Sequence, residues 1–260
     1  MTPRTDNILN AAIDNWRHWD TGTQSRISGP PKVEKQLIGG LTNEAFLVTS
    51  GDLRAVVRVN SANTDALGIS REREHRLLTV LQPSGCVPRL LFSDSEVQIT
   101  QLIEGRHLTR GDLKDKVMQD HLENCIERIQ SYSVDYMTKR NYKNYINLYS
   151  DQVPNFDGLS EIESAASLID MGEWEPVISH HDLILENIIW SNQGMFFIDW
   201  EYAHLGHPSI DHVKLFGRNY CYIMADMQTI NALYTLHSGI TKLWYALQEI
   251  LQNTNQVTQG

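Results

Sequence analysis

Residues 178–202 read ISHHDLILENIIWSNQGMFFIDWEY. The apolar runs in this stretch predict short buried strands that form a hairpin. Polar side chains lie at the ends of these runs. Three of them, His180, Asp182 and Asn187, come before the hairpin. Asp199 follows Asn187 by twelve residues, at the end of the second run. Polar groups at the ends of buried strands indicate a functional site here.

The spacing of these polar residues favours one kind of chemistry. An enzyme that transfers a phosphoryl group uses a carboxylate to orient and deprotonate the acceptor hydroxyl. It also needs hard oxygen ligands for Mg²⁺, which neutralises charge on the transferred phosphate. Asp182 fits the role of the base, and Asn187 and Asp199 fit the role of metal ligands. The stretch therefore contains the residue types that magnesium-dependent phosphoryl transfer uses, although such a pattern alone also occurs by chance.

The composition predicts a globular protein that binds small molecules rather than nucleic acids. A chain of 260 residues, 41% of them hydrophobic, can bury a large core as one domain or as two lobes. The formal net charge of -10 and the pI near 5.4 argue against binding to nucleic acid, which requires a basic surface. Small cationic ligands suit this acidic field better.

Cysteine usage and hydropathy indicate where the protein resides. Cys86, Cys125 and Cys221 are odd in number and widely spaced, so they suggest neither a disulfide framework nor a CxxC metal site. No apolar run approaches the roughly 18 to 20 residues of a membrane helix, and the N-terminus lacks the apolar segment of a signal peptide. We expect a cytoplasmic protein without a membrane span.

The first hundred residues predict a small antiparallel sheet with helices. Residues 7–19 and 69–82 place apolar side chains at helical spacing. Between them, β-prone runs over residues 33–59 are separated by two glycine-containing turns, which predicts an antiparallel meander. Residues 88–103 predict two further strands. A sheet-rich lobe therefore extends over residues 1–103.

Beyond residue 103 the periodicity is mainly helical, apart from the hairpin. The predicted helices cover residues 111–131, 141–151, 160–171 and 209–252. We therefore predict an α+β fold of two lobes, with a small antiparallel-sheet lobe followed by a larger helical lobe over residues 104–260. The natural ligand site of such a layout is the cleft between lobes.

Several motifs resemble those of the choline kinase, thiamine kinase and aminoglycoside phosphotransferase superfamily, which has the protein-kinase-like fold. The resemblance extends from about residue 37 to about residue 215. Its motifs, in order, are LIGGLTNEAFLV from residue 37, VVRVN from 56, SREREHRLL from 70, TQLIEGRHLT from 100, SHHDLILENIIW from 179, FIDWEYA from 197 and GHPSIDHVKL from 206. The resemblance implies a kinase that uses ATP and Mg²⁺.

The resemblance also implies which residues bind the nucleotide. Arg58 is expected to meet the nucleotide phosphates, and Glu74 of the following helix to pair with it, although Glu72 could serve almost as well. The residues expected to cover the phosphates or to form the hinge are Gly39, Gly40, Thr42, Asn43, Gln101 and Ile103. In isolation, Gly39 and Gly40 would be read as a hairpin turn.

The same resemblance assigns roles in the helical lobe. Asp182 is expected to be the catalytic base, and His180 to hold the catalytic loop through hydrogen bonds. Asn187 and Asp199 are expected to bind Mg²⁺, and Glu201 either assists them or binds backbone. The sequence departs from the family pattern at His181, where small or polar residues are usual, and in DHVKL, which is more polar than the usual DLA.

The acceptor is expected to be a small cationic metabolite, with choline, ethanolamine or thiamine first. Aromatic rings bind such cations, and Tyr220, Trp244 and Tyr245 are candidates for this role, although helical spacing also suits a core position. Asp211 and Asp226 are candidates for the accompanying carboxylates.

Three alternatives remain open at this point: an aminoglycoside acceptor, a non-catalytic nucleotide-binding pseudokinase, and a helical interaction protein whose polar hairpin is a surface turn. We expect a monomer or a homodimer.

Overall fold

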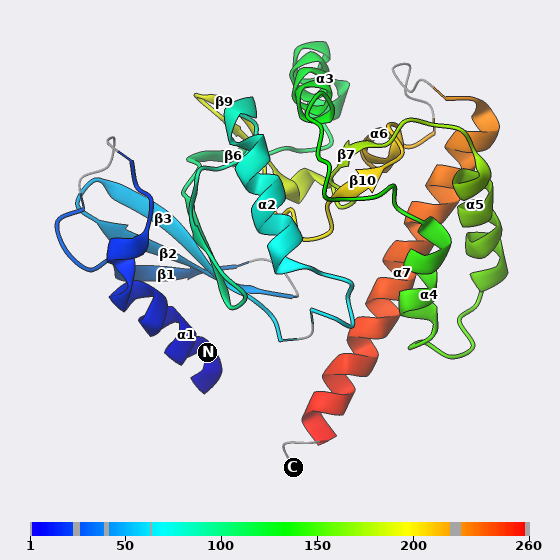
Figure 1. Ribbon diagram of the computed structural model, residues 1–260. Coiled ribbons are helices and arrows are strands. Elements are labelled where there is room, and N and C mark those ends of the chain that lie inside the picture. The colour runs from blue at the N-terminus through cyan, green and yellow to red at the C-terminus, as the bar shows by residue number, and fades with distance from the viewer. Residues whose placement is uncertain (1, 23–26, 39–41, 63, 219–224, 258–260) are drawn as a thin grey trace. The chain divides into compact units, whose positions relative to one another are not determined.

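A computed structural model describes residues 2–22, 27–38, 42–62, 64–218 and 225–257, with the side chains of 252–257 left aside (Figure 1). The chain divides into two compact units. The first unit comprises Met1–Thr64, Ser70–Leu108 and Ile188–Glu201, and the second comprises Asp65–Ile69, Thr109–Asn187 and Tyr202–Gly260. The lobe boundary expected between residues 103 and 104 stays a prediction. The predicted α+β class is confirmed, because a five-stranded antiparallel sheet and a set of helices make up the fold.

The first unit is built on this five-stranded sheet, in which every pair of neighbours is antiparallel. In sheet order the strands are β1 (Lys32–Leu37), β2 (Glu44–Ser50), β3 (Leu53–Val59), β5 (Val97–Gln101) and β4 (Leu90–Ser93). Side chains of β3 alternate between buried and more exposed positions, as a strand with one face on the core requires. Gly51 turns β2 into β3 with a positive φ of 59°, which glycine adopts without strain. The predicted meander and the two further strands are confirmed.

Two helices belong to the first unit. Helix α1 (Pro3–Asp14) buries Ile8 and Leu9 in the same apolar cluster as Phe46 and Val57 of the sheet. It begins earlier than predicted, because the Thr2 side chain caps it and proline occupies its first turn. A 3₁₀ turn, Trp16–His18, takes up the end of the predicted helical stretch.

Helix α2 (Arg71–Leu81) begins at Ser70, whose hydroxyl accepts a hydrogen bond from the backbone N–H of Arg73. It buries Leu77, Leu78 and Leu81, as predicted, and it also buries the charged side chain of Glu74. A 3₁₀ turn, Gln82–Ser84, follows it.

The predicted hairpin is present as β8 (Ile188–Ser191) and β9 (Gly194–Phe197), and β6 (Gly105–His107) adds a third strand. The strand β6 approaches β8 closely at Gly105, where an added Cβ would lie 2.4 Å from the backbone oxygen of Trp190. Asn187 immediately precedes β8 in the chain, and Asp199 follows β9 by two residues.

The second unit is mainly helical. Its helices are α3 (Lys116–Gln130), α4 (Tyr142–Ser150), α5 (Leu159–Met171), α6 (Ile210–Phe216) and α7 (Met227–Val257), and its two strands are β7 (Val177–Ser179) and β10 (His204–Gly206). Helices α4 and α5 run beside the long helix α7 (Figure 1), and Ile146, Ile162 and Leu236 share their core. Short 3₁₀ turns lie at Asp112–Lys114 and Leu185–Asn187.

Helix boundaries in the second unit differ from the predicted ones in two places. The helix predicted over 209–252 is divided, because α6 ends where Gly217 adopts a positive φ of 73° and α7 begins ten residues later at Met227. The helix predicted from residue 111 begins instead at Lys116, capped by the side chain of Asp115.

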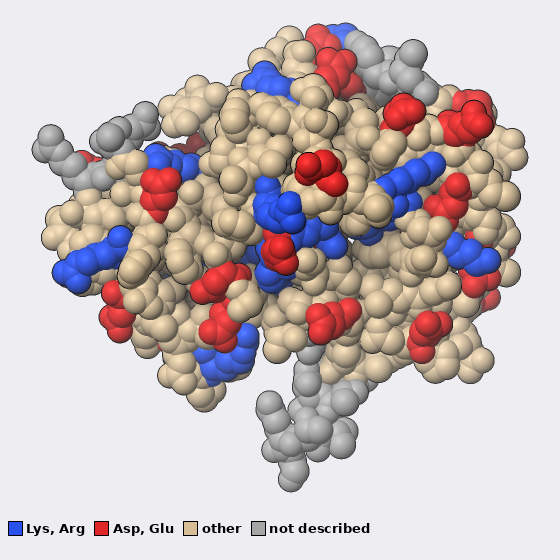
Figure 2. All heavy atoms as spheres, viewed as in Figure 1, with Lys and Arg blue, Asp and Glu red and all other residues tan. Residues whose placement is uncertain are grey.

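The surface agrees with the acidic composition. On the face shown in Figure 2, acidic side chains occur across the surface with Lys and Arg side chains between them. Within the part of the chain that the structure describes, none of the helices is both long enough and apolar enough to cross a membrane.

Candidate active site

Arg58 and Glu74 form a buried ion pair in the first unit. The two guanidinium nitrogens Nη1 and Nη2 of Arg58 donate to Oε1 and Oε2 of Glu74 at 2.8 and 2.7 Å. Their side chains are 11% and 1% exposed. The alternative partner, Glu72, is 83% exposed and lies 3.9 Å from Arg76 instead. The partner of Arg58 in α2 is therefore Glu74.

The pair is held in its charged form. Burial alone would raise the pKa of Glu74, but the charges and hydrogen bonds of Arg58 and Arg71 outweigh it and lower the pKa to about 2. Burial likewise opposes the charge on Arg58, and Glu74 raises the pKa of Arg58 above its ordinary value nonetheless. Two parallel hydrogen bonds of this kind fix the orientation of the guanidinium group and also stabilise the ion pair.

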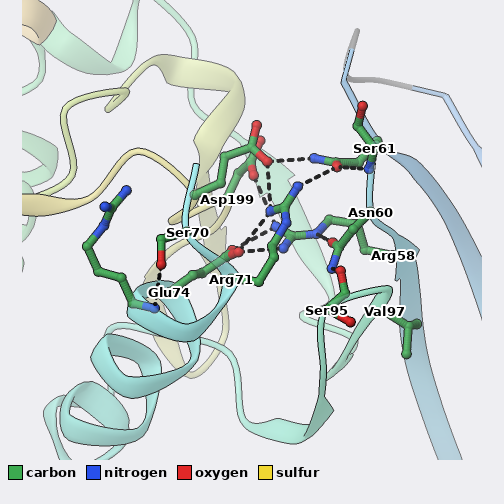
Figure 3. Close-up of polar contacts among 12 residues, drawn as sticks. Arg58, Asn60, Ser61, Ser70, Arg71, Glu74, Ser95, Val97 and Asp199 are labelled. Atoms are coloured by element: carbon green, nitrogen blue, oxygen red, sulfur yellow. Dashed lines mark hydrogen bonds and ion pairs between the residues drawn. The ribbon is translucent and has the colours of Figure 1, made fainter. Parts of the chain in front are cut away.

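Arg71 extends this pair into a network (Figure 3). Its Nη1 lies 3.0 Å from Glu74 Oε2 and 3.0 Å from Glu201 Oε2, and its Nη2 donates to the side-chain oxygen of Asn43 at 3.0 Å. The amide of Asn43 also donates to Glu201 Oε2 at 2.8 Å. Sequence analysis missed Arg71, because one arginine in a run of charged residues looks like a solvated helix face.

Glu201 and Asn43 are therefore placed by this network. Glu201 is buried, and the oxygen Oε2 already accepts from Asn43 and Arg71. Glu201 thus binds the side chains of Asn43 and Arg71, and its expected assistance to the metal ligands stays a prediction. Asn43 joins the segment before β2 to the start of α2 and also accepts from the backbone N–H of Ser61 at 3.0 Å.

Asp199 lies at the edge of the network with a strained backbone. Its φ is 64°, in the left-handed region that residues other than glycine rarely adopt. Its Oδ1 lies 3.3 Å from Arg58 Nη1, and its side chain is 36% exposed. The ion pairs of Arg58 and Arg71 reach three carboxylates, those of Glu74, Glu201 and Asp199. Asp199 is the most exposed of these carboxylates, and its oxygens suit a hard cation such as Mg²⁺.

The loop that carries Asp182 is fixed by Asp211 of α6 in the second unit. The two carboxylate oxygens of Asp211 accept hydrogen bonds from the backbone N–H groups of His180 and His181 at 2.7 and 2.9 Å. His181 adopts a positive φ of 63°, a strain that these hydrogen bonds help to hold. Asp211 is buried by this role, so the expectation that it would face an acceptor cation is wrong.

Among the described residues, the side chain of Asp182 contacts Lys214 and Asn187. Lys214 Nζ donates to Asp182 Oδ1 at 2.6 Å. The amide nitrogen of Asn187 donates to the backbone oxygen of Asp182 at 2.9 Å and to its Oδ2 at 3.3 Å. The carboxylate is still 31% exposed, so a substrate hydroxyl can reach it. The second unit thus brings together Asp182 and Asn187, as predicted, and adds Lys214.

The two histidines before Asp182 are buried and make contacts within the second unit. His180 is buried, and its Nδ1 accepts from the backbone N–H of Asp182 at 3.3 Å. His181 Nε2 lies 3.3 Å from the hydroxyl of Tyr142, and burial, followed by the charge of Arg140, lowers the pKa of His181 well below its ordinary value. An added Cβ at Gly206 would lie 2.5 Å from the His181 ring. His181 is therefore a neutral packing residue.

The residues predicted to form the hinge, Gln101 and Ile103, lie at or just after the end of β5. Gln101 and Ile103 line a cavity of about 210 Å³, together with Asp52, Arg54 and other residues of the first unit. The backbone N–H groups of Gln101 and Leu102 already donate to Arg89 and Arg54 oxygens, at 2.9 and 3.0 Å. Thr42 belongs to the described chain, whereas Gly39 and Gly40 lie outside the described residues, so their expected role remains a prediction.

The aromatic candidates for the acceptor site are only partly described. Trp244 donates from Nε1 to the hydroxyl of Tyr202 at 2.7 Å and packs against the helical core. Tyr245 meets Trp244 edge-on, with ring centroids 5.1 Å apart, and is 54% exposed. Tyr220 lies outside the described residues. Asp226 accepts from Thr229 at the start of α7. The expected Mg²⁺ ligands are Asn187 and Asp199, with Glu201 as a candidate third. Among the described residues, no group of three or more His, Cys, Asp or Glu side chains could hold a metal.

Comparisons with known proteins agree with this geometry. A family model described as choline/ethanolamine kinase matches residues 34–230. Protein LicA of Haemophilus influenzae is 22% identical over 185 residues, which make up 67% of this chain and 55% of that protein. The chain thus spans little more than half the length of this curated relative.

Two solved structures show the same fold. The crystal structure of the choline kinase LicA from Streptococcus pneumoniae is 20% identical, has a TM-score of 0.74, and is matched over 95% of this chain and 91% of that chain. A thermostable mutant of an aminoglycoside phosphotransferase is 15% identical, with a TM-score of 0.64 over 87% and 92% of the two chains. The superfamily predicted from the motifs is confirmed. Since the family model matches more than half of the residues, the chain belongs to the choline/ethanolamine kinase family.

Proposed function

We propose that this protein transfers the γ-phosphoryl group of ATP, with Mg²⁺, to the hydroxyl of a small alcohol. The observation that carries the proposal is the loop of Asp182. Asp211 holds its backbone, while the Asp182 carboxylate stays partly exposed beside the Asn187 amide. A carboxylate that is fixed yet reachable is what orienting and deprotonating a substrate hydroxyl requires.

The roles of the other residues follow from their charges. Arg58, oriented by Glu74, binds phosphate oxygens of the nucleotide. Asp199 and Asn187 would hold Mg²⁺, and the partly exposed carboxylate of Asp199, whose oxygens suit a hard cation, supports this assignment. Bound Mg²⁺ would neutralise charge on the β- and γ-phosphates. Because phosphoryl transfer requires little covalent chemistry from the protein, these residues act mainly by positioning and by electrostatic stabilisation.

Choline and ethanolamine are the first acceptors to test, since the family supports them, and thiamine is a further cationic alcohol. The acidic composition and the exposed ring of Tyr245 support a cationic acceptor. An aminoglycoside is the second candidate, favoured by the fold shared with an aminoglycoside phosphotransferase.

The test is formation of ADP and of the phosphorylated product with a panel of choline, ethanolamine, thiamine and several aminoglycosides. The proposal expects turnover of at least one acceptor that requires Mg²⁺ and is lowered about 10²-fold or more by Asp182→Asn. Stabilisation by Mg-ATP without turnover of any acceptor would instead indicate a nucleotide-binding pseudokinase. If no nucleotide raises the thermal midpoint, an interaction protein is the better description.

A further inference from the structure

Lys214 places a buried positive charge on the candidate base. Its Nζ lies 2.6 Å from Asp182 Oδ1 and 3.3 Å from the backbone oxygen of His181. The Lys214 side chain is 10% exposed, whereas that of Asp182 is 31% exposed. An ammonium group withdrawn from water to this extent requires a charged or hydrogen-bonding partner, and Asp182 supplies it.

The pairing limits how the Asp182 carboxylate can turn. Lys214 holds Oδ1, and the amide of Asn187 lies at Oδ2. The terminal torsion of an aspartate is broad, so an unpaired carboxylate would sample many orientations. Donors on both oxygens select one orientation. An ionised carboxylate has about four lone-pair sites, so two hydrogen bonds leave room for a substrate hydroxyl.

Helix α6 supplies both supports of this loop. Asp211 binds the backbone of His180 and His181, and Lys214, three residues later on the same side of the helix, binds the Asp182 side chain. The helix is itself anchored, because His212 lies 3.0 Å from Glu123 of α3 in a buried pair.

The nearby histidine does not compete for the carboxylate. His237 of α7 carries a pKa lowered to about 4, first by burial and then by the positive charge of Lys214. His237 is therefore neutral near pH 7. Lys214 is the cation that contacts Asp182 among the described residues.

We propose that Lys214 is a positioning residue for the transfer: it holds the Asp182 carboxylate in the orientation that receives the acceptor hydroxyl. This inference rests on the proposed function. Lys214 acts through Asp182, so its contribution should vanish when Asp182 can no longer serve as the base. A side chain that served the fold alone would contribute equally with or without the Asp182 carboxylate.

The test is a double-mutant cycle of Lys214→Met and Asp182→Asn, measured with the best acceptor. Lys214→Met should lower kcat about 10- to 100-fold, the scale of a misplaced reacting group, with less than about a twofold change in the KM for ATP. Lys214→Arg should recover much of the loss, because a guanidinium also donates to a carboxylate. In the Asp182→Asn background, Lys214→Met should cost less than about a further twofold.

The matched control is Lys116→Met, which removes an exposed lysine paired with Asp120 on α3 of the same unit. It should leave kcat within about twofold of wild type. Equal losses from Lys214→Met with and without the Asp182 carboxylate would overturn the proposal, and so would wild-type kcat in Lys214→Met.

A second measurement does not require turnover. It therefore tests the contact between Lys214 and Asp182 even if the proposed function fails. The ammonium signal of Lys214 in ¹⁵N NMR, identified by its loss in Lys214→Arg, should be protected from exchange with water and should shift in Asp182→Asn. If the wild type phosphorylates none of the acceptors, the proposed function fails, whereas a protected signal still supports the positioning of Asp182. A Lys214 signal that exchanges as fast as that of Lys116 would overturn the proposal in either case.

Discussion

The charged cluster around Arg58 and the loop of Asp182 use charge in different ways. In the cluster of Arg58, Arg71 and Glu74, the carboxylate of Glu74 binds both arginines. The side chains of all three residues are largely buried, with exposures of 11%, 8% and 1%. In the loop, Asp182 makes single contacts with Lys214 and Asn187 and remains accessible. A group with several buried partners sets stability as well as function, whereas an accessible group with few partners can change function alone.

The largest effect is expected from Glu74→Gln. The change preserves volume but leaves Arg58 and Arg71 without the carboxylate that neutralises both. Removing one partner of a buried pair costs about 3 to 5 kcal/mol, and the lower end applies here because Asp199 and Glu201 remain nearby. The free energy of unfolding, measured by urea denaturation, should fall accordingly.

The exposed neighbour on the same helix is the control. Glu72→Gln removes a carboxylate that is 83% exposed, so stability should change by less than about 0.5 kcal/mol. Equal stability of the two variants would mean that burial of the Glu74 carboxylate in the Arg58 cluster contributes nothing to the free energy of unfolding.

The pH dependence of the Glu74 effect checks its cause. The pKa of Glu74 is lowered from 4.5 to about 2 in the folded protein, so its stabilisation is complete above pH 4.5. The stabilisation is lost as the pH falls from 4.5 through about 2, because the carboxylate then binds a proton in the folded state too. The stability difference between wild type and Glu74→Gln should therefore shrink over this acidic range.

Local patterns were sufficient to predict what depends on neighbours in the chain. The β-prone runs and the turns between them over residues 33–59 predicted the meander, and the Leu77, Leu78 and Leu81 spacing predicted α2. Local patterns could not show which of several charges is buried. Arg71 and Lys214 were not distinguished, because their partners Glu201 and Asp182 lie far away in sequence.

Backbone geometry was equally invisible to periodicity. The break in the helix predicted over 209–252 depends on the positive φ of Gly217, and one glycine within a helical pattern is not by itself a break. The role of Asp211 was misjudged for a similar reason. The sequence does not show that the backbone N–H groups of His180 and His181, which lie about thirty residues earlier, bind its carboxylate and bury it. The ring at Tyr245 was identified as a candidate, but its exposure could not be read from the sequence.

The second-largest effect is expected from Asp182→Asn, and it should fall on catalysis. Loss of the base lowers kcat by about 10²-fold or more, equivalent to about 3 kcal/mol in the activation free energy. Stability should change less than in Glu74→Gln, because the amide oxygen can still accept a hydrogen bond from Lys214 at a partly exposed position. Rates and urea denaturation on the same preparation measure both. Turnover near the wild-type level would remove Asp182 from the role of base.

An intermediate effect is expected from Asp199→Ala. Asp199 contacts Arg58 of the buried cluster, but its own side chain is 36% exposed, as an accessible ligand requires. The affinity for Mg-ATP, measured by calorimetry, should fall about tenfold or more, which corresponds to about 1.4 kcal/mol. Asn187→Ala should act in the same direction with a smaller change, because it removes a neutral ligand. Unchanged affinity in Asp199→Ala would indicate that another oxygen, such as one of Glu201, is the principal ligand.

The smallest effect is expected from Tyr245→Leu, which extends the contrast to a more exposed side chain. Tyr245 is 54% exposed and forms a T-shaped pair with Trp244, so the free energy of unfolding should change by less than about 0.5 kcal/mol. If its ring faces a cationic acceptor, loss of a cation–π contact of about 0.5 to 1 kcal/mol should raise the KM for choline about two- to fivefold. The KM for ATP should stay unchanged, and so should that for a neutral alcohol of the same shape, such as 3,3-dimethylbutan-1-ol. Equal increases for charged and neutral acceptors would mean that Tyr245 contributes shape rather than charge recognition, and no increase would place the acceptor away from the Trp244 and Tyr245 side of α7.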